Sequence, residues 1–278
     1  MAQPPPERIA GNHGFRNLGL RLRSAAVLAP PVFAGIYFGS PWFDVLIVLA
    51  GGVMAWEWAT MCSSSRFDLV GWLMEAGIAA CLISLYAGNP ALSLLAAAIV
   101  VIVVMGVAAI RRHDSPARLG MGAGIISVFC LSFVWLRALP DTGLELVIWL
   151  VVAVWFTDAG GYFFGKMIGG PKLAPRISPN KTWAGLAGGI LLATLWSVAA
   201  LSWGGGHAIG PAMAAAVGIA VLAQLGDLSV SAVKRRFGVK DTSGLIPGHG
   251  GVLDRLDGML LTGPTAAFVL VLYGKGWI

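Results

Sequence analysis

Charged residues are scarce in this chain. Only 12% of its 278 residues are Asp, Glu, Lys or Arg, whereas about a quarter of the residues of an ordinary soluble domain are charged. Hydrophobic residues make up 57% of the chain, and its mean hydropathy is +0.80. This composition excludes a water-soluble globular enzyme and indicates an integral membrane protein.

The chain also lacks the spacings of common metal and nucleotide motifs. Its 3 cysteines form no C-x-x-C pair and its 4 histidines form no H-E-x-x-H, so zinc-binding functions have no support. The segment from Gly160 to Met167 satisfies G-x-x-x-x-G-K, but Met stands where a P-loop needs Ser or Thr. The net charge of +6 comes from short basic clusters without a continuous basic face, which argues against a nucleic-acid partner.

Nine apolar runs are long enough to cross a bilayer, because a spanning helix needs about 20 residues. They lie at 24–40, 43–62, 69–87, 90–110, 119–138, 144–163, 183–203, 208–227 and 256–274. With these spans, 17 of the 19 Lys and Arg residues fall on the side of the amino terminus, and only Arg137 and Lys275 fall on the other. Since basic loops stay in the cytoplasm, we predict an all-α polytopic membrane protein with about nine transmembrane helices and a cytoplasmic amino terminus.

The spans suggest three regions. Residues 1–23 are interpreted as a retained cytoplasmic leader, because the apolar run that starts near Ala25 has no convincing cleavage site. Residues 24–138 form the amino-terminal transmembrane helices, and residues 139–278 form a carboxyl-terminal transmembrane catalytic region. The cytoplasmic loops at 164–182 and 228–255 are long and polar, so we expect the chemistry there.

Six acidic residues lie within or at the ends of the spans, where an ionised carboxylate costs at least about 2.5 kcal/mol and needs a partner or a task. They are Glu57, Glu75, Asp158, Asp227, Asp254 and Asp257. We interpret the two glutamates as satisfied buried carboxylates. The four aspartates all lie at cytoplasmic ends of spans, so their side chains can converge.

The spacing around these aspartates favours a cation site. If the eighth span continues as a helix, Asp227, Ser231 and Lys234 share one face. Asp254 and Asp257 would lie side by side at the start of the ninth span, and two neighbouring carboxylates with phosphate are suited to Mg²⁺. An exposed DxxD pair is the alternative, but the adjacent glycine-rich GLIPGHGG favours metal and phosphate.

The loop at 164–182 is basic and contains no acidic residue. Its cations are Lys166, Lys172, Arg176 and Lys181. They fit two interpretations, a loop that binds lipid head groups or an electropositive wall for a polyphosphate. Charge alone does not separate the two.

The motifs resemble those of one enzyme family. The run SAVKRRFGVKDTSGLIPGHGGVLDRLD, from Ser231 to Asp257, resembles position for position the carboxyl-terminal motif of phosphatidate cytidylyltransferases. The blocks DAGGYFFGK at 158–166 and KLAPRISPNKT at 172–182 are similar to the family's central loop. The chain differs from the family pattern at Ala184 and Val230, where glutamate is common.

This resemblance implies transfer of CMP from CTP to phosphatidic acid, with Mg²⁺ as the cofactor and room for a second, monovalent cation. The implied metal ligands are Asp227, Asp254 and Asp257. The implied catalytic residues are Lys234, Arg235, His249 and Arg255. The implied substrate-binding residues are Asp158, Lys166, Ser178, Lys181, Ser231, Lys240 and Asp241.

The implied partners are CTP, phosphatidic acid and membrane lipids, and a homodimer is compatible with the sequence. Since we recognise no secretory, mitochondrial or plastid leader, we expect a bacterial-type cytoplasmic (inner) membrane, with the active site facing the cytoplasm.

Two other functions use similar residues. A CDP-alcohol phosphatidyltransferase shares the opening Asp254-x-x-Asp257-Gly258, but no Ala-Arg follows at the required offset, and the two further spaced aspartates of its motif do not appear in the rest of the chain. A cation-coupled transporter would also use intramembrane acids, but it would place them on both sides of the midplane. The polar groups predicted here gather on one side, so the transporter is retained only as the alternative.

Overall fold

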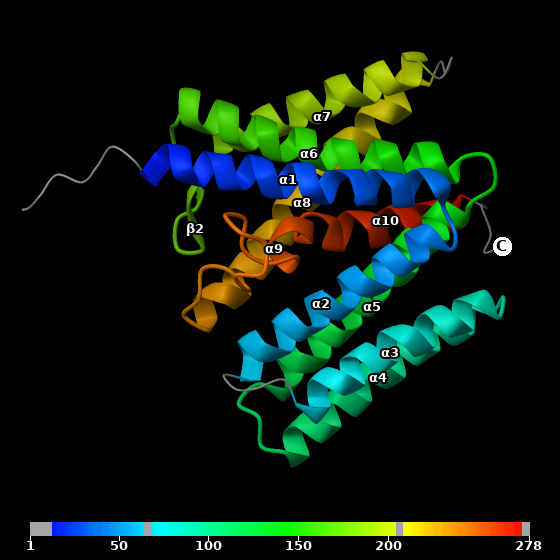
Figure 1. The fold of residues 1–278 in the computed structure, drawn as a ribbon. Helices are drawn as coiled ribbons and strands as arrows, with labels where there is room; N and C mark the ends of the chain where they lie inside the picture. Colours follow the sequence, from blue (N-terminus) through cyan, green and yellow to red (C-terminus); the bar gives the residue numbers. More distant parts are fainter. Residues whose placement is uncertain (1–12, 64–67, 204–207, 274–278) are drawn as a thin grey trace, which may run out of the picture.

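The computed structural model describes residues 13–63, 68–203 and 208–273. Ten helices and two short strands follow one another along these ranges (Figure 1). The elements are α1 His13–Phe38, α2 Trp42–Ser63, α3 Leu69–Tyr86, α4 Pro90–Ile110, α5 Pro116–Ala138, α6 Gly143–Met167, β1 Lys172–Ala174, β2 Ser178–Thr182, α7 Trp183–Trp203, α8 Ile209–Arg236, α9 Leu253–Leu256 and α10 Met259–Leu272.

The predicted class, an all-α polytopic membrane protein, is confirmed. Seven helices within the described ranges, α2 to α8, are long and apolar enough to cross a membrane. The first and ninth expected spans are helical too, but their apolar stretches are shorter and cover 26–38 and 259–272. Helix α1 begins at one end of the molecule and α10 finishes at the other (Figure 1).

Local sequence signals set several helix ends. Asp68 caps α3 by accepting a hydrogen bond from the amide of Val70. Asn89 caps α4 in the same way through Leu92 N–H, and Pro90 occupies the first turn, where its missing N–H has no cost. These caps satisfy backbone donors that an apolar environment would leave unpaired.

The core lies around α5, whose side chains are buried along most of its length. Helices α2, α3, α4, α6 and α10 all pack against it. Large buried side chains fill the space between α2 and α5, among them Trp58, Phe129 and Ile126. Helices α4 and α7 bury much less of their surface, as expected of helices at the boundary with lipid.

The structure differs from the sequence-based prediction in one loop and at the start of one span. The segment before the seventh span is not a plain loop, because its residues pair as an antiparallel hairpin in which Lys172 faces Thr182 and Ala174 faces Ser178. This polar segment satisfies its backbone groups by strand pairing. The ninth span begins at Met259 instead of residue 256, since the helix is interrupted at residues 257–258 between α9 and α10. By contrast, α8 does continue past Asp227, to Arg236.

Glycines bring α6 and α7 into close contact. A Cβ added at Gly160 of α6 would lie 2.5 Å from the carbonyl oxygen of Gly188 in α7. A Cβ on Gly189 would meet the Thr157 carbonyl oxygen at 2.8 Å. Small residues at such a crossing let two backbones approach, as is typical of helix pairs in membranes.

We therefore expect Gly160→Ala to destabilise the protein by about 1–3 kcal/mol, because the added methyl group overlaps backbone that cannot move aside. The matched control is Gly106→Ala in α4, where a Cβ would meet nothing within 4 Å. Thermal unfolding of the detergent-purified variants measures the difference. Equal melting temperatures for the two variants would contradict this packing.

Candidate active site

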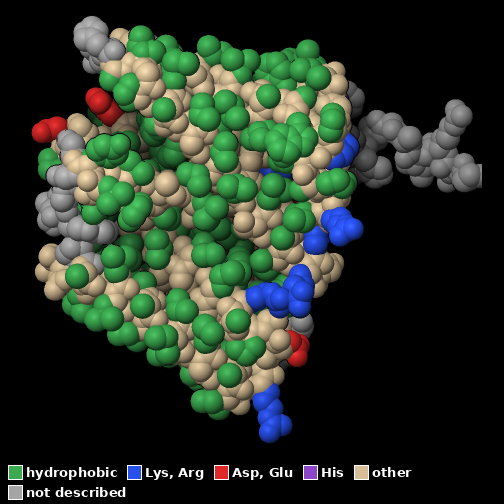
Figure 2. Space-filling model, turned by 180° about the vertical axis from the view of Figure 1, so that it is seen from behind, with side chains coloured by type: hydrophobic (Ala, Val, Ile, Leu, Met, Phe, Trp, Pro, Cys, Tyr) green, Lys and Arg blue, Asp and Glu red, His purple; other side chains and the backbone are tan. Residues whose placement is uncertain are grey.

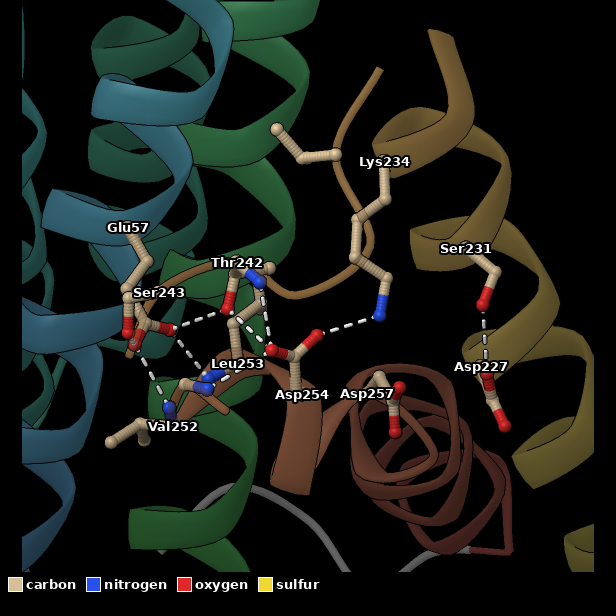
Figure 3. Close-up of polar contacts among 12 residues, drawn as sticks. Glu57, Asp227, Ser231, Lys234, Thr242, Ser243, Val252, Leu253, Asp254 and Asp257 are labelled. Atoms are coloured by element: carbon tan, nitrogen blue, oxygen red, sulfur yellow. Dashed lines mark hydrogen bonds and ion pairs between the residues drawn. The ribbon is translucent and has the colours of Figure 1, made fainter. Parts of the chain in front are cut away.

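A buried carboxylate in α2 holds the glycine-rich loop in place (Figure 3). Glu57 has no exposed surface. Its Oε1 accepts hydrogen bonds from Ser243 Oγ at 2.6 Å and Val252 N at 2.9 Å. Its Oε2 accepts from Thr242 Oγ1 at 3.1 Å and Leu253 N at 2.7 Å. Glu57 therefore joins the amino-terminal helices to the loop at 242–252 and to the start of α9.

The interpretation of Glu57 as a satisfied carboxylate fits these contacts, but its partners were not predicted. One clue was present in the glycine at position 251. A Cβ there would overlap both Thr242 Oγ1 and a carboxylate oxygen of Glu57. Gly248 and Gly250 have positive φ angles of 78° and 83°, so the loop needs glycine for its backbone path as well.

A second buried carboxylate ties the loop to α8. Asp254 Oδ1 lies 2.6 Å from Lys234 Nζ. Asp254 Oδ2 accepts from Thr242 N at 2.8 Å and Gly251 N at 3.0 Å. Thr242 Oγ1 lies 3.0 Å from the same oxygen, and its single hydroxyl hydrogen is shared between Asp254 and Glu57. Lys234 and Asp254 are 7% and 6% exposed. Both oxygens of Asp254 thus accept hydrogen bonds from protein donors, and the carboxylate ties the loop to α8.

These contacts also set the charge of Asp254. Burial alone would raise the pKa of its carboxyl, but the hydrogen bonds from Lys234 and from the Gly251 and Thr242 amides outweigh burial and lower the pKa below the ordinary 3.8. Asp254 is therefore ionised at neutral pH, as its pairing with Lys234 requires.

The other aspartates form a second group, and Figure 3 shows two of them, Asp257 and Asp227, farther from Glu57 than Asp254 is. Asp227 Oδ2 lies 2.6 Å from Lys181 Nζ, and its Oδ1 accepts from Ser231 Oγ at 3.1 Å. The carboxyl group of Asp158 in α6 interacts electrostatically with Asp227, Lys181 and Arg255. The structure thus brings the two sequence motifs, 158–182 and 231–257, to one place.

Asp257 belongs to this second group and not to a pair with Asp254. Burial and then the negative charge of Asp227 raise the pKa of Asp257 to about 8. Its Oδ1 accepts from Gly258 N at 2.9 Å. Lys234 is a neighbour of both carboxylates of the DxxD sequence, because it pairs with Asp254 and its charge also acts on Asp257, and Asp257 in addition faces Asp227 and Asp158.

The donor set of this second group suits Mg²⁺. Within the described ranges, no three His, Cys, Asp or Glu side chains come together as a ready metal cage. Mg²⁺, however, is commonly held by one or two carboxylates together with substrate phosphates and water. Asp227 and Asp257 supply hard oxygen donors next to lysine, and their mutual repulsion favours a cation between them. The residues therefore fit the ion.

The remaining expected site residues lie around this centre. Lys166 is exposed and its Nζ lies 5.7 Å from the ring centroid of Tyr162. Arg235 donates to the carbonyl oxygens of Ile177 and Val239, each at 3.3 Å, and thereby ties the hairpin to the end of α8.

Three further expected residues line the glycine-rich loop or its approach. His249 Nδ1 lies 2.8 Å from Ser24 Oγ, which connects the loop to α1. Lys240 and Asp241 are exposed just before the loop. Ser178 begins strand β2, four residues before Thr182, and is placed by the hairpin and not by a contact with the aspartates.

Fold and site together define a polytopic helical membrane protein with a polar site of lysines and aspartates near one end of its helices. A family model described as "Cytidylyltransferase family" matches residues 19–273. The chain therefore belongs to the cytidylyltransferase family.

Relatives that match almost the whole chain carry the name phosphatidate cytidylyltransferase. The one from Brucella suis is 36% identical over 272 residues, which cover 93% of each chain. The one from Pseudomonas aeruginosa is 35% identical over 269 residues and covers 92% of this chain and 97% of its own. The one from Rickettsia bellii is 32% identical and covers 98% and 99%.

Replacing Glu57 by Gln should loosen the loop, because an amide offers one acceptor oxygen where four donors converge and each lost charge-assisted hydrogen bond costs about 1.5–3 kcal/mol. Hydrogen–deuterium exchange of peptides that cover 242–256 should become faster, since the amides of Val252 and Leu253 lose their acceptor. Glu145→Gln, at an exposed residue in the first turn of α6, is the control. Unchanged exchange in Glu57→Gln would refute the anchoring role.

Replacing Asp254 by Asn should destabilise the protein by about 3–5 kcal/mol at neutral pH, because Lys234 would stay buried without a counter-charge. The pKa of Asp254 is lowered in the folded state, so its contribution is complete above the ordinary pKa of 3.8 and is lost as the pH falls through the lowered value.

The difference in melting temperature between wild type and Asp254→Asn should therefore shrink below about pH 4. Asp114→Asn, at an exposed loop residue, controls for general effects of acid. A constant difference across the pH range would show that the ion pair does not carry the effect.

Proposed function

We propose that this chain is a phosphatidate cytidylyltransferase, which transfers CMP from CTP to phosphatidic acid and leaves CDP-diacylglycerol in the membrane. Its family and the relatives of that name support this function over the transporter alternative. The observation that carries the proposal within the structure is the 2.6 Å contact between Lys181 and Asp227. It places the basic hairpin loop against the acidic face of α8, where two phosphate-bearing substrates can meet.

The reaction brings two polyanions together. A phosphate oxygen of phosphatidic acid attacks the α-phosphorus of CTP, the bond from that phosphorus to the bridging oxygen breaks, and pyrophosphate leaves with the electron pair. The attacking phosphate is already ionised near neutral pH, so the site needs no strong general base. Its task is to screen charge and to align the reacting groups.

The cations around the aspartates suit this task. Lys181 is the basic side chain nearest Asp227, and the charge of Arg255 reaches Asp158. Lys240 and Arg235 are exposed at the end of α8 and the start of the loop, where they can meet phosphates arriving from water. Lys234 has a different role in this proposal, because its ammonium is buried against Asp254.

Asp227 and Asp257 would hold Mg²⁺. When bound, the ion supplies positive charge to the triphosphate and to the developing pyrophosphate. Ser231 supports this arrangement by donating to Asp227 Oδ1, which fixes the orientation of the carboxylate. Asp254 stabilises the loop that carries Asp257 and is not included among the metal ligands.

The proposal includes nine crossings of a bacterial cytoplasmic membrane, with the amino terminus and the site on the cytoplasmic side. Two observations support it. The first residues of α1 and the last residues of α10 lie on opposite sides of the molecule (Figure 1). Figure 2 shows Lys and Arg side chains along one edge of the molecule, next to a broad surface rich in apolar side chains. Such a basic edge is typical of the cytoplasmic side.

Detergent-purified protein should convert labelled CTP and phosphatidic acid into a lipid-soluble CDP product, and EDTA should abolish the product. Asp227→Asn and Lys181→Met should each lower kcat on the order of 10²-fold, because the first weakens the binding of Mg²⁺ and the second removes a positive charge that stabilises the transition state. Asp114→Asn should retain wild-type activity. Product formation in EDTA, or full activity of Asp227→Asn, would overturn the assignment of the metal site.

A further inference from the structure

One buried amide in the membrane-spanning part of α8 has no partner. Gln224 is 7% exposed, and within the described part of the chain its side chain makes no hydrogen bond. Buried polar side chains are nearly always hydrogen-bonded. Ser132, Thr157 and Ser197 in the spans follow this rule, because each donates to a carbonyl oxygen one turn earlier in the same helix, whereas among the described residues the hydroxyls of Ser127 and Thr194 share the unpaired state of Gln224. Gln224 is therefore an exception that needs a reason.

The amide of Gln224 lies where α6 and α8 approach each other and keeps a little accessible surface. Its unpaired polar atoms are not completely buried within the described residues, so they remain accessible to a small ligand. A Cβ added at Gly161 of α6 would lie 3.6 Å from Gln224 Nε2. Gly161 is one turn from Asp158, and Gln224 is one turn from Asp227. The amide thus lies beside Gly161 of α6, one helical turn from the level of both carboxylates.

The depth of Gln224 distinguishes it from the phosphate-binding residues. At 1.5 Å per residue, it lies about 4.5 Å further into α8 than Asp227 and about 15 Å further than Lys234. The basic end of the helix, Lys234 to Arg236, marks the side from which a water-soluble nucleotide arrives. A group beyond Asp227 on the hydrocarbon side is better placed for the lipid than for CTP.

A primary amide suits the polar group that a glycerolipid places at this depth. The ester carbonyls lie a few bonds from the phosphate, on its hydrocarbon side, and they accept hydrogen bonds but donate none. An amide offers two N–H donors without a charge that must be desolvated.

We propose that Gln224 donates a hydrogen bond to an ester carbonyl of the lipid substrate and so positions its phosphate at Asp227. This inference rests on the proposed function, because it names the part of phosphatidic acid that Gln224 binds.

The test compares two lipids that differ only in this carbonyl. Wild-type protein in mixed micelles is given diester phosphatidic acid or the dialkyl ether analogue with equal chain lengths. The expected kcat/KM is about 3- to 10-fold higher for the diester than for the ether, because one hydrogen bond contributes a free energy of that size. In Gln224→Met, which keeps the length of the side chain but removes the donor, this preference should fall to about 1, while KM for CTP stays unchanged.

Ser132→Ala is the matched control, because Ser132 is also 7% exposed in a spanning helix but bonds within α5. It should keep the diester preference. Equal kcat/KM values of the wild-type protein for the two lipids would overturn the inference without any variant. The test therefore remains decisive even if Gln224→Met fails to fold. An undiminished preference or a raised KM for CTP in Gln224→Met would also overturn it. No CDP-lipid from either substrate would instead overturn the proposed function, and this inference with it.

Discussion

A carboxylate inside a membrane helix has to find hydrogen-bond donors, and in this protein that requirement organises the site. Glu57 obtains all four of its donors from one segment, 242–253. The segment in turn presents Thr242 and Gly251 to Asp254, and Asp254 binds Lys234 of α8. Three parts of the molecule that are distant in sequence are thus connected through two buried carboxylates. Apolar packing alone would not fix a glycine-rich loop in one conformation.

The acidic residues divide into two kinds. Glu57 and Asp254 accept hydrogen bonds on both oxygens from donors in the 242–253 segment or Lys234, whereas Asp158, Asp227 and Asp257 lie close to one another beside Lys181 and Arg255. The first kind stabilises the fold because its charges are compensated. The second kind is poorly compensated, which suits a place where a metal ion and phosphates enter. Gln224 extends this second group toward the hydrocarbon without adding charge.

Much of this arrangement could be predicted from the sequence, because hydropathy and charge act locally. The apolar runs located each helix, although α1 begins eleven residues before the predicted start at 24, and the spacing of Asp227, Ser231 and Lys234 indicated the continuation of α8 to Arg236. The partners of Glu57 and Asp254 could not be predicted, since they depend on how distant helices pack. The break between α9 and α10 was missed for a related reason: the i, i+3 spacing of Asp254 and Asp257 fits a helix, and only the tertiary contacts divide the pair.

The hydrogen bonds between Glu57 and the 242–253 segment also impose an order on the biogenesis of the protein. Glu57 precedes Thr242 by 185 residues, so α2 leaves the ribosome and enters the membrane long before any of its donors has been synthesised. During that interval the carboxyl is best accommodated in its neutral, protonated form or near water at the membrane surface. The site therefore cannot assemble progressively as the helices insert. Its loop closes onto α2 only after nearly the whole chain has been translated.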